Sequence, residues 1–434
     1  MSLTRSLTRP LTRKISRADL TQGFGGSFSP FALDPYLLFD ARDSMVGTLE
    51  NPTLDLNPAL PETLDVITAT RAGIATYTDS SGLIKAAPID TVRVDYVDSV
   101  PMILVEPSAT NKLSYSEDFS NPDWTKSAIL IDSNQTEAPN GSIVADKLME
   151  EGVNQTHLVF KAGITDLGTI SVYAKQGDAN NRLFQIRRDG GSNSWSWFDL
   201  QAGTVEYQTQ GVASIEDAGN GWHRCSFTPT NSNGTVVFGL SNGGLTRGES
   251  YEGDGTSGVY IWGAQLEAGS VATSYIPTSG STVTRAADDL VISGSAFSDF
   301  YNASEGTIYV ELQSKVVADT VHTRFSFNDG TNGNSMYSLL SSNHDLLVKF
   351  GGNSTGYSSQ SNVLQANEYH RLAASYIVNN FITSRNGSLS STQPATQPIP
   401  PVNRLVLGAI ENNTRHLNGH IKRLIYWPYH SDSL

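Results

Sequence analysis

The middle of this chain consists of short runs of β-branched and aromatic residues that are separated by turn-forming residues. Between residues 109 and 290, these runs cover residues 169–174, 183–186, 194–198, 236–240 and 259–262. Asp-Gly-Gly-Ser-Asn at 189–193 and Asn-Ser-Asn-Gly at 231–234 lie between them, and Gly and Asn readily adopt the positive φ that tight turns need. No stretch of this region sustains a helical period. The pattern predicts an all-β sandwich or jelly roll.

Composition narrows the class of protein further. The chain has 434 residues, enough for about three domains of roughly 150 residues each. Charged residues make up 17% of it and glycine contributes 38 residues, which is typical of extracellular β-proteins and particle surfaces rather than helical cytosolic enzymes. The single cysteine, Cys225, cannot form a disulfide within the chain, so packing alone must hold the fold, and we expect Cys225 to be a small buried hydrophobe.

Positive charge is concentrated at the N-terminus. Residues 1–17 carry no acidic residue, and their basic residues are Arg5, Arg9, Arg13, Lys14 and Arg17. Subtracting these five from the 29 basic residues leaves 24 against 43 acidic residues, a net charge of −19 for the rest of the chain. The body therefore repels nucleic acid, and only the N-terminal segment could bind a polyanion.

The same segment repeats Leu-Thr-Arg with a period of four residues, and Pro10 interrupts any helix that this period could form. We expect residues 1–30 to be an extended basic arm that folds on docking, with a disordered tail that has no partner as the alternative. No apolar core of signal-peptide type and no apolar run of about 18 residues occurs. The protein is therefore expected to be made in a cytoplasm, without export by its own signal and without membrane insertion.

Four blocks in the middle region are distinctive. They are Asn111 to Phe119 together with Trp124, Ser171 to Lys175, Ile215 to Cys225, and residues 251–288. In this order they resemble the opening, middle and closing strands of a lectin-like, carbohydrate-binding-like jelly-roll module. That module recurs in structural proteins of tailed bacteriophages and of phage-derived particles such as gene-transfer agents.

A second set of blocks follows in the C-terminal region. It begins with Glu305 to Glu311, which alternates apolar and polar residues as a half-buried strand does, and its last block is Leu417 to Pro428. The order of these blocks resembles a concanavalin-A-like or laminin-G-like sandwich of the kind appended to phage fibres and spikes. The run from Ala69 to Pro107, with short strands expected near 74–78, 82–85 and 92–96, resembles the connector that precedes the jelly-roll module in such proteins.

These patterns together predict an all-β protein with two antiparallel β-sandwich domains after an N-terminal particle-attachment segment. The expected parts are a basic anchoring arm at 1–30, a small β-rich connector at 31–108, a jelly-roll carbohydrate-binding-like domain at 109–292 and a concanavalin-A-like or laminin-G-like domain at 295–434.

The sequence offers no recognisable catalytic motif. The eight histidines are scattered, and the Gly-x-Ser-x-Gly elbow, the His-Glu-x-x-His pair and paired cysteines are missing from the sequence. A glycoside hydrolase needs only two carboxylates about 5 to 9.5 Å apart, so the 43 acidic residues leave that alternative open. The coil repeats of tailspike depolymerases are not visible, however. We therefore expect a protein that is not an enzyme.

A candidate sugar-binding site lies in the jelly-roll region. Trp195 and Trp197 flank Ser196 in a predicted strand, and alternation places both indoles on one face of it, with Arg187, Arg188 and Asp189 nearby. If that face is the core, the two indoles are packing residues. If it is exposed, they form an aromatic platform of the kind on which sugars stack. Trp222 and Trp262 lie inside the resembling blocks and are expected in the core.

Jelly-roll modules of this kind often hold a structural Ca²⁺ through acidic residues of their first and last strands. In this chain Ser120 follows Phe119, where many relatives have an acid, and Trp262 and Gly263 stand where paired acids often occur. The resemblance therefore does not support a calcium site, and no metal or other cofactor is expected.

The resemblance implies a homo-oligomeric spike or fibre protein on a virion surface, made in the cytoplasm of a bacterial host. It would attach by its N-terminus to capsid or tail proteins and bind host cell-surface polysaccharide. The alternative is a purely structural head decoration or tail protein that binds no glycan.

Overall fold

In the computed structural model, the described residues are 49, 51–177, 182–190, 194–230, 234–315, 322–339, 346–357, 366–389, 398–432 and 434. The chain divides into two units, Met1–Ser44 and a compact unit Met45–Leu434. The basic arm expected at 1–30 lies outside the described residues. Among the described residues no helix is long and apolar enough to cross a membrane.

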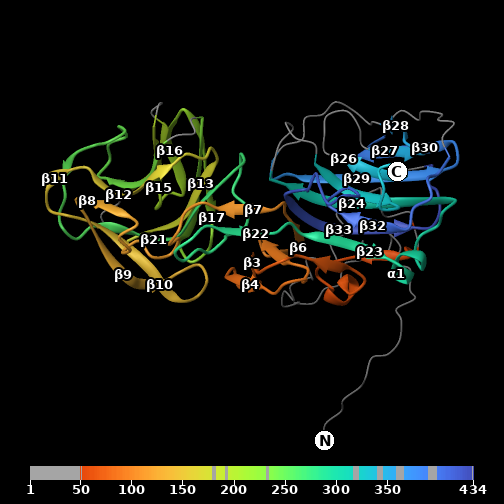
Figure 1. Cartoon of the computed structure of the whole chain (residues 1–434), viewed down its shortest axis with the longest axis horizontal. Helices are drawn as coiled ribbons and strands as arrows, with labels where there is room; N and C mark the ends of the chain where they lie inside the picture. The colour runs from red at the N-terminus through yellow and green to blue at the C-terminus, as the bar shows by residue number, and fades with distance from the viewer. Residues whose placement is uncertain are drawn as a thin grey trace, which may run out of the picture. The chain divides into compact units, whose positions relative to one another are not determined.

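The middle of the chain forms a sandwich of two antiparallel sheets (Figure 1). The first sheet has the order β17 (Gly211–Asp217), β18 (Trp222–Pro229), β13 (Thr169–Gln176), β21 (Gly258–Glu267), β10 (Ile143–Glu150), β9 (Ile129–Glu137). The second has the order β16 (Thr204–Thr209), β15 (Ser194–Asp199), β14 (Leu183–Asp189), β19 (Gly234–Ser241), β12 (His157–Ile164), β8 (Thr125–Ser127). A two-stranded sheet of β11 (Asn154–Gln155) and β20 (Tyr251–Glu252) lies outside them.

The alternation of apolar residues along these strands builds the core between the sheets. Val172 from the first sheet and Phe184, Ile186 and Phe238 from the second are all fully buried in one cluster. Cys225 belongs to the same cluster, which confirms it as a small buried hydrophobe, and burial raises the pKa of its thiol. The all-β sandwich that the sequence predicts is confirmed for this region.

Trp222 and Trp262 are buried as expected, but in a different place. They pack with Tyr173 and Tyr275 in a smaller cluster, separate from the core between the sheets. The indole nitrogen of Trp222 donates a hydrogen bond to the carbonyl of Glu137, 3.0 Å away.

A second sandwich contains the C-terminal strands. One sheet has the order β31 (Ser388–Leu389), β30 (Asn380–Arg385), β29 (Tyr369–Ile377), β24 (Glu305–Ser314), β33 (Gly419–Trp427), β6 (Val100–Val105), β5 (Val94–Val97), and β1 (Leu54–Leu56) also pairs with β33. The other has the order β2 (Thr68–Thr70), β23 (Asp289–Ser293), β32 (Arg404–Leu407), β25 (Thr323–Asn328), β26 (Ser335–Leu339), β27 (Leu346–Phe350), β28 (Asn353–Tyr357). The short helix α1 (Ser295–Ser298) and the 3-10 turn η1 (Pro61–Leu64) also lie in this part of the chain.

The structure corrects the expectation of a separate connector over 31–108. Within its described residues, β1, β5 and β6 extend the sheet built on β33, and β2 pairs with β23 in the opposite sheet. Leu56, Ile103 and Val105 are fully buried in the core of the second sandwich. The sequence pattern did not reveal this because a run such as Met-Ile-Leu-Val at 102–105 shows that a strand is buried, but not which strand is its partner.

The first sandwich is therefore inserted into the second. The chain leaves the second sandwich after β6 and returns to it at β23, and between these points it builds the whole first sandwich. The two crossings run side by side as β7 (Ala109–Asn111) paired with β22 (Val283–Arg285) (Figure 1). A hairpin of β3 (Ala75–Thr78) and β4 (Ile84–Ala87) branches off before β5.

A buried cluster of charged groups lies at these crossings. The guanidinium of Arg93 lies 2.8 Å from the Glu106 carboxylate and 2.5 Å from that of Asp288. Arg71 pairs with Asp288 at 3.0 Å, and Arg285 lies 3.4 Å from Glu106. All five side chains are at most 1% exposed. We call these residues the junction cluster.

The cluster holds Glu106 in its charged form. Burial alone would raise the pKa of Glu106, but the attraction of Arg285 and Arg93 outweighs it, and the pKa lies well below its ordinary value. Hydrogen bonds from the Ser274 amide and hydroxyl, at 2.7 and 2.6 Å, add to this effect. Because Ser274 belongs to the inserted part of the chain, the carboxylate connects the two sandwiches.

The insertion predicts how fragments behave. A fragment of residues 295–434 lacks β1, β2, β5, β6 and β23, which leaves one edge of β33 unpaired and exposes part of its core, so it should aggregate or remain unfolded. A chain that joins residues 49–107 to residues 286–434 through a short linker should fold, as should residues 109–285 alone. Circular dichroism and size-exclusion chromatography of the three fragments check this. A folded, monomeric 295–434 fragment would contradict the insertion.

The junction cluster predicts a large effect of one substitution. Arg93→Met leaves the carboxylates of Glu106 and Asp288 buried with fewer partners, so the free energy of unfolding should fall by about 3–5 kcal/mol. Arg423→Met is the matched control, because its pair with Asp55 is about one-third exposed and should contribute less than about 1 kcal/mol. Urea denaturation of the two variants and the parent measures both effects.

The pH dependence follows from the same group. The folded-state pKa of Glu106 is depressed, so its stabilising effect is fully present above its ordinary value of 4.5 and is lost as the pH falls through the folded-state pKa. The parent should therefore lose stability below that value more steeply than Arg93→Met does. Equal slopes in the two proteins would show that the cluster is not the source.

Candidate functional site

The site that the sequence suggests lies on one face of the second sheet of the inserted sandwich. Along β14, Phe184 and Ile186 point into the core, so Gln185 and Arg187 point to the opposite face. The strand register places Trp197 opposite Gln185 and Trp195 opposite Arg187. Both indoles therefore lie on the face that points away from the core, which we call the outer face.

Trp195 is the partly exposed indole of the pair. It stacks on Tyr207 of β16, with ring centroids 5.8 Å apart and an angle of 29° between the planes. Tyr207 is 39% exposed, and Trp195 is half-buried. The indole nitrogen of Trp195 donates to the carbonyl of Leu245, 3.2 Å away, which fixes the orientation of the ring. Trp195 and Tyr207 therefore form an aromatic surface that is held in place and open to solvent.

Trp197 has a different role. It is 1% exposed, and its indole nitrogen donates to the carbonyl of Thr246 at 3.2 Å. The loop at 242–250 supplies the acceptors for both indoles. Trp197 therefore anchors this loop to the sheet, and the surface that meets solvent is formed by its neighbour Trp195 and by Tyr207.

A small ionic network borders the aromatic pair. The Asp189 carboxylate lies 2.8 Å from the guanidinium of Arg187 and 2.7 Å from that of Arg247. Arg187 also donates to the Arg247 carbonyl at 2.6 Å. The Arg187 side chain is nearly buried, whereas the Arg247 side chain is 40% exposed. Burial lowers the pKa of Arg187, and the charge of Asp189 opposes this effect only in part.

Two buried donors beneath this face have no partner among the described residues. They are Nε2 of Gln185 and Nε of Arg187. Buried donors usually find acceptors, so a pair of unpaired donors under one surface is uncommon.

The structure separates Arg188 from the other candidates. Arg188 is 1% exposed and lies on the opposite side of β14 from Arg187. It donates to the carbonyls of Ile164 and Asp166, both 2.9 Å away. The outer face thus brings together Trp195, Trp197, Arg187 and Asp189, while Arg188 stabilises a loop on the other side.

Three contributors to this site were not identified from the sequence: Tyr207, Arg247 and Gln185. Tyr207 lies in β16, whose polar residues did not indicate a strand, and Arg247 lies in a loop without any period. The alternation that assigned Trp195 and Trp197 to one face could have found Gln185, because it lies two residues before Arg187.

The remaining predicted site residues have the following places. Arg5, Arg9, Arg13, Lys14 and Arg17, the anchoring residues, lie outside the described residues. In the described part of the chain, no group of three or more His, Cys, Asp or Glu side chains is arranged to hold a metal ion. Next to Phe119, Asp118 accepts hydrogen bonds from the Ser120 hydroxyl and the Asn121 amide, at 2.6 and 3.1 Å.

Comparison with known proteins gives only distant similarity. No protein-family model matches the chain, and a search of curated proteins found no match. Among solved structures, the CBM40 module of Ruminococcus gnavus IT-sialidase bound to alpha2,3 sialyllactose is 16% identical, with 30% of this chain and 80% of that chain covered and a TM-score of 0.26.

Two further solved structures cover more of the chain. The CBM22-1-CBM22-2 tandem of Paenibacillus barcinonensis Xyn10C is 10% identical and covers 73% of this chain and 97% of that one, with a TM-score of 0.23. Domains LG4-5 of the mouse laminin alpha1 chain are 10% identical and cover 78% and 93%, with a TM-score of 0.24. At such TM-scores these similarities carry no argument about function, and the β-sandwich architecture follows from the strand pairings themselves.

Proposed function

We propose that this chain is a surface spike or fibre protein of a phage-like particle, attached by its N-terminus, and that it binds host cell-surface glycan through the outer face. The observation that supports glycan binding is the stacked pair of Trp195 and Tyr207, held open to solvent beside the network of Arg187, Asp189 and Arg247. The proposal of a particle rests on the resemblance of the sequence blocks and on the basic N-terminal segment.

The chemistry of the outer face suits a sugar. Pyranose rings present apolar C–H faces, which pack on aromatic rings, and hydroxyl groups, which need hydrogen-bond partners at the edge of the ring. Trp195 and Tyr207 offer the apolar surface. The exposed guanidinium of Arg247 offers donors beside it. Because Asp189 already accepts from two guanidiniums, it orients Arg247 rather than contacting the sugar itself.

Each such contact would be weak, on the order of millimolar, and multivalency would supply the strength. Many copies on one particle raise the overall affinity by about 10² to 10⁴ without any new contact. A homo-oligomer with capsid or tail proteins as partners fits this arrangement. In the alternative, a purely structural decoration or tail protein, the same face serves assembly and binds no glycan.

The outer face predicts opposite effects for its two tryptophans. Trp195→Ala should weaken binding to host surface polysaccharide about fivefold, because a ring contact contributes roughly 1 kcal/mol, while leaving thermal unfolding nearly unchanged. Trp197→Ala should cost about 3–5 kcal/mol of folding free energy, because its ring is buried. Tyr369→Ala, at a 37% exposed tyrosine on the other sandwich, is the matched control for loss of an exposed ring.

The measurements are binding of protein-coated beads to host cells, binding to the isolated polysaccharide, and thermal unfolding. If the intact protein binds no host-surface polysaccharide, the glycan-binding proposal is wrong and the alternative of a purely structural protein is favoured. If Trp195→Ala lost as much stability as Trp197→Ala, Trp195 would be a packing residue and not part of an exposed aromatic platform.

The N-terminal arm predicts a separate result. Deleting residues 2–17 removes Arg5, Arg9, Arg13, Lys14 and Arg17, all the basic residues that precede the first acid, so the shortened protein should fold but no longer assemble onto particles. The measurement is the amount of protein on purified particles, with a Leu→Ala version of the same segment as the control that retains the charge. Normal incorporation of the shortened chain would exclude the arm as the anchor.

A further inference from the structure

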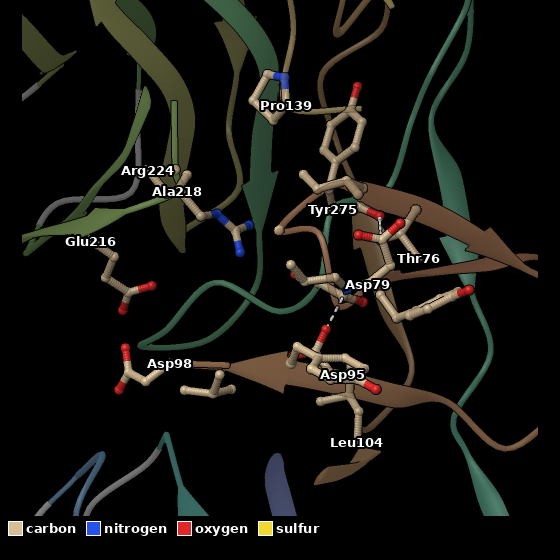
Figure 2. A pocket seen from close by; sticks show the side chains of 18 of the residues that line it. Thr76, Asp79, Asp95, Asp98, Leu104, Pro139, Glu216, Ala218, Arg224 and Tyr275 are labelled. Carbon is tan, nitrogen blue, oxygen red and sulfur yellow. Dashed lines mark hydrogen bonds between the residues drawn. The ribbon is translucent and has the colours of Figure 1, made fainter. Parts of the chain in front are cut away.

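A second candidate site lies away from the outer face, in a pocket of about 580 Å³. Its walls come from the β3–β4 hairpin, the β5–β6 turn, β17 and β18 of the inserted sandwich, and a few residues of the second sandwich (Figure 2). No residue of the outer face lines it. The volume is within the range of small-molecule sites, about 300–1,000 Å³.

Hydrogen bonds between separate segments hold the walls together. The Ile84 amide donates to the Pro139 carbonyl at 2.9 Å, and the Thr76 hydroxyl donates to the Tyr275 carbonyl at 2.5 Å, so the hairpin is fixed to the inserted sandwich. On the other side, the Asp95 carboxylate lies 2.8 Å from the ring of His420 in β33. The pocket therefore has walls that are positioned before any ligand arrives.

Acceptors without partners line one part of the pocket. Asp98, at the β5–β6 turn, and Glu216, on β17, are both exposed, and neither carboxylate has a hydrogen-bond or ion-pair partner among the described residues. Figure 2 shows both carboxylates at the edge of the cavity, with Asp95 on the opposite wall. A ligand with hydroxyl or ammonium hydrogens could bind there.

A buried donor faces the same space. Arg224 on β18 is 8% exposed, and its guanidinium points into the cavity (Figure 2). It makes one hydrogen bond, from NH2 to the Ser171 hydroxyl at 3.1 Å, and stacks over the ring of Tyr173. Its Nε has no partner in the described part of the chain, and although Glu216 is the residue directly opposite on β17, the two side chains form no ion pair. A buried guanidinium that lacks a carboxylate indicates a site for an oxygen acceptor.

The charge of the pocket restricts the ligand. Its lining includes five carboxylates, from Asp79, Asp95, Asp98, Glu216 and Asp217. The cationic side chains among the lining residues are Arg224, Lys315 and, when protonated, His420. An anionic ligand would be repelled by this excess of negative charge. The ligand must therefore both donate and accept hydrogen bonds and carry no negative charge.

Sugar hydroxyl groups meet this requirement because each both donates and accepts. Tyr77 and Tyr96 are half-buried in the lining and can pack against the C–H face of a ring. We propose that this pocket is a second saccharide site, specific for a neutral or amino sugar. Arg224 donates to a ligand oxygen, and Asp98 and Glu216 accept from hydroxyl or ammonium groups. The proposal does not depend on glycan binding at the outer face.

The test uses the full chain and three disaccharide probes: chitobiose without its acetyl groups, cellobiose and a uronic-acid disaccharide. Saturation-transfer NMR should detect binding, and titration of each disaccharide into the protein should give its affinity. The amino sugar should bind most tightly and the neutral sugar more weakly, and the uronic-acid disaccharide should show no measurable binding. Glu216→Gln and Asp98→Asn should each weaken binding about tenfold, the size expected for a lost hydrogen bond to a charged group. Both residues are exposed, so their variants should fold as the parent does.

Two control variants lie outside both the pocket and the outer face. Glu252→Gln changes an exposed glutamate on β20 and should leave disaccharide binding unchanged. Tyr369→Ala removes an exposed ring from the second sandwich and should also leave disaccharide binding unchanged. The proposal is overturned if none of the probes binds at millimolar concentration, if the uronic-acid probe binds most tightly, or if Glu216→Gln and Asp98→Asn bind as the parent does.

Discussion

The buried junction cluster is the interaction on which the arrangement of the two sandwiches depends. Arg93 directly precedes β5, and its guanidinium contacts the carboxylates of Glu106 and Asp288. These are the residues at which the chain leaves and re-enters the second sandwich. Buried ion pairs contribute little net stability against an apolar alternative, but losing one partner is costly. The cluster therefore specifies one arrangement: any other path of the chain through this point would leave charges buried and unpaired. The sheets are completed by segments far apart in sequence, and this cluster fixes where those segments meet.

The geometry of both candidate sites follows from sheet construction. On the outer face, alternation along β14 and β15 separates core residues from the aromatic pair, and a single loop covers Trp197 while leaving Trp195 accessible. In the pocket, a hairpin before the insertion, strands of the insertion and β33 after it supply different walls. The outer face is thus a property of one sheet. The pocket exists only because one sandwich is inserted into the other.

Local sequence patterns predicted much of the secondary structure and part of the outer face. The run from 194 to 198 indicated a strand, and its alternation correctly placed Trp195 and Trp197 on one face. Pairing between distant segments could not be predicted, since the register of β6 against β33 joins residues more than 300 positions apart. The periodicity of the sequence also gives no sign that the loop at 242–250 folds over Trp197. A strand pattern shows which residues are buried and which face of the strand they share. The neighbouring strand with which it pairs depends on the whole fold.

The insertion also has a consequence for synthesis on the ribosome. The hydrophobic strand β6 is complete when Val105 has been made, but its partner β33 begins at Gly419. At about 5–20 residues per second, the edge of β6 waits roughly 15 to 60 seconds for that partner. During this time one edge of β6 is paired with β5, but the other edge of the Met-Ile-Leu-Val run is open to wrong pairing, either with the inserted strands or with another nascent chain. An insert that folds quickly and independently would remove its own strands from that competition.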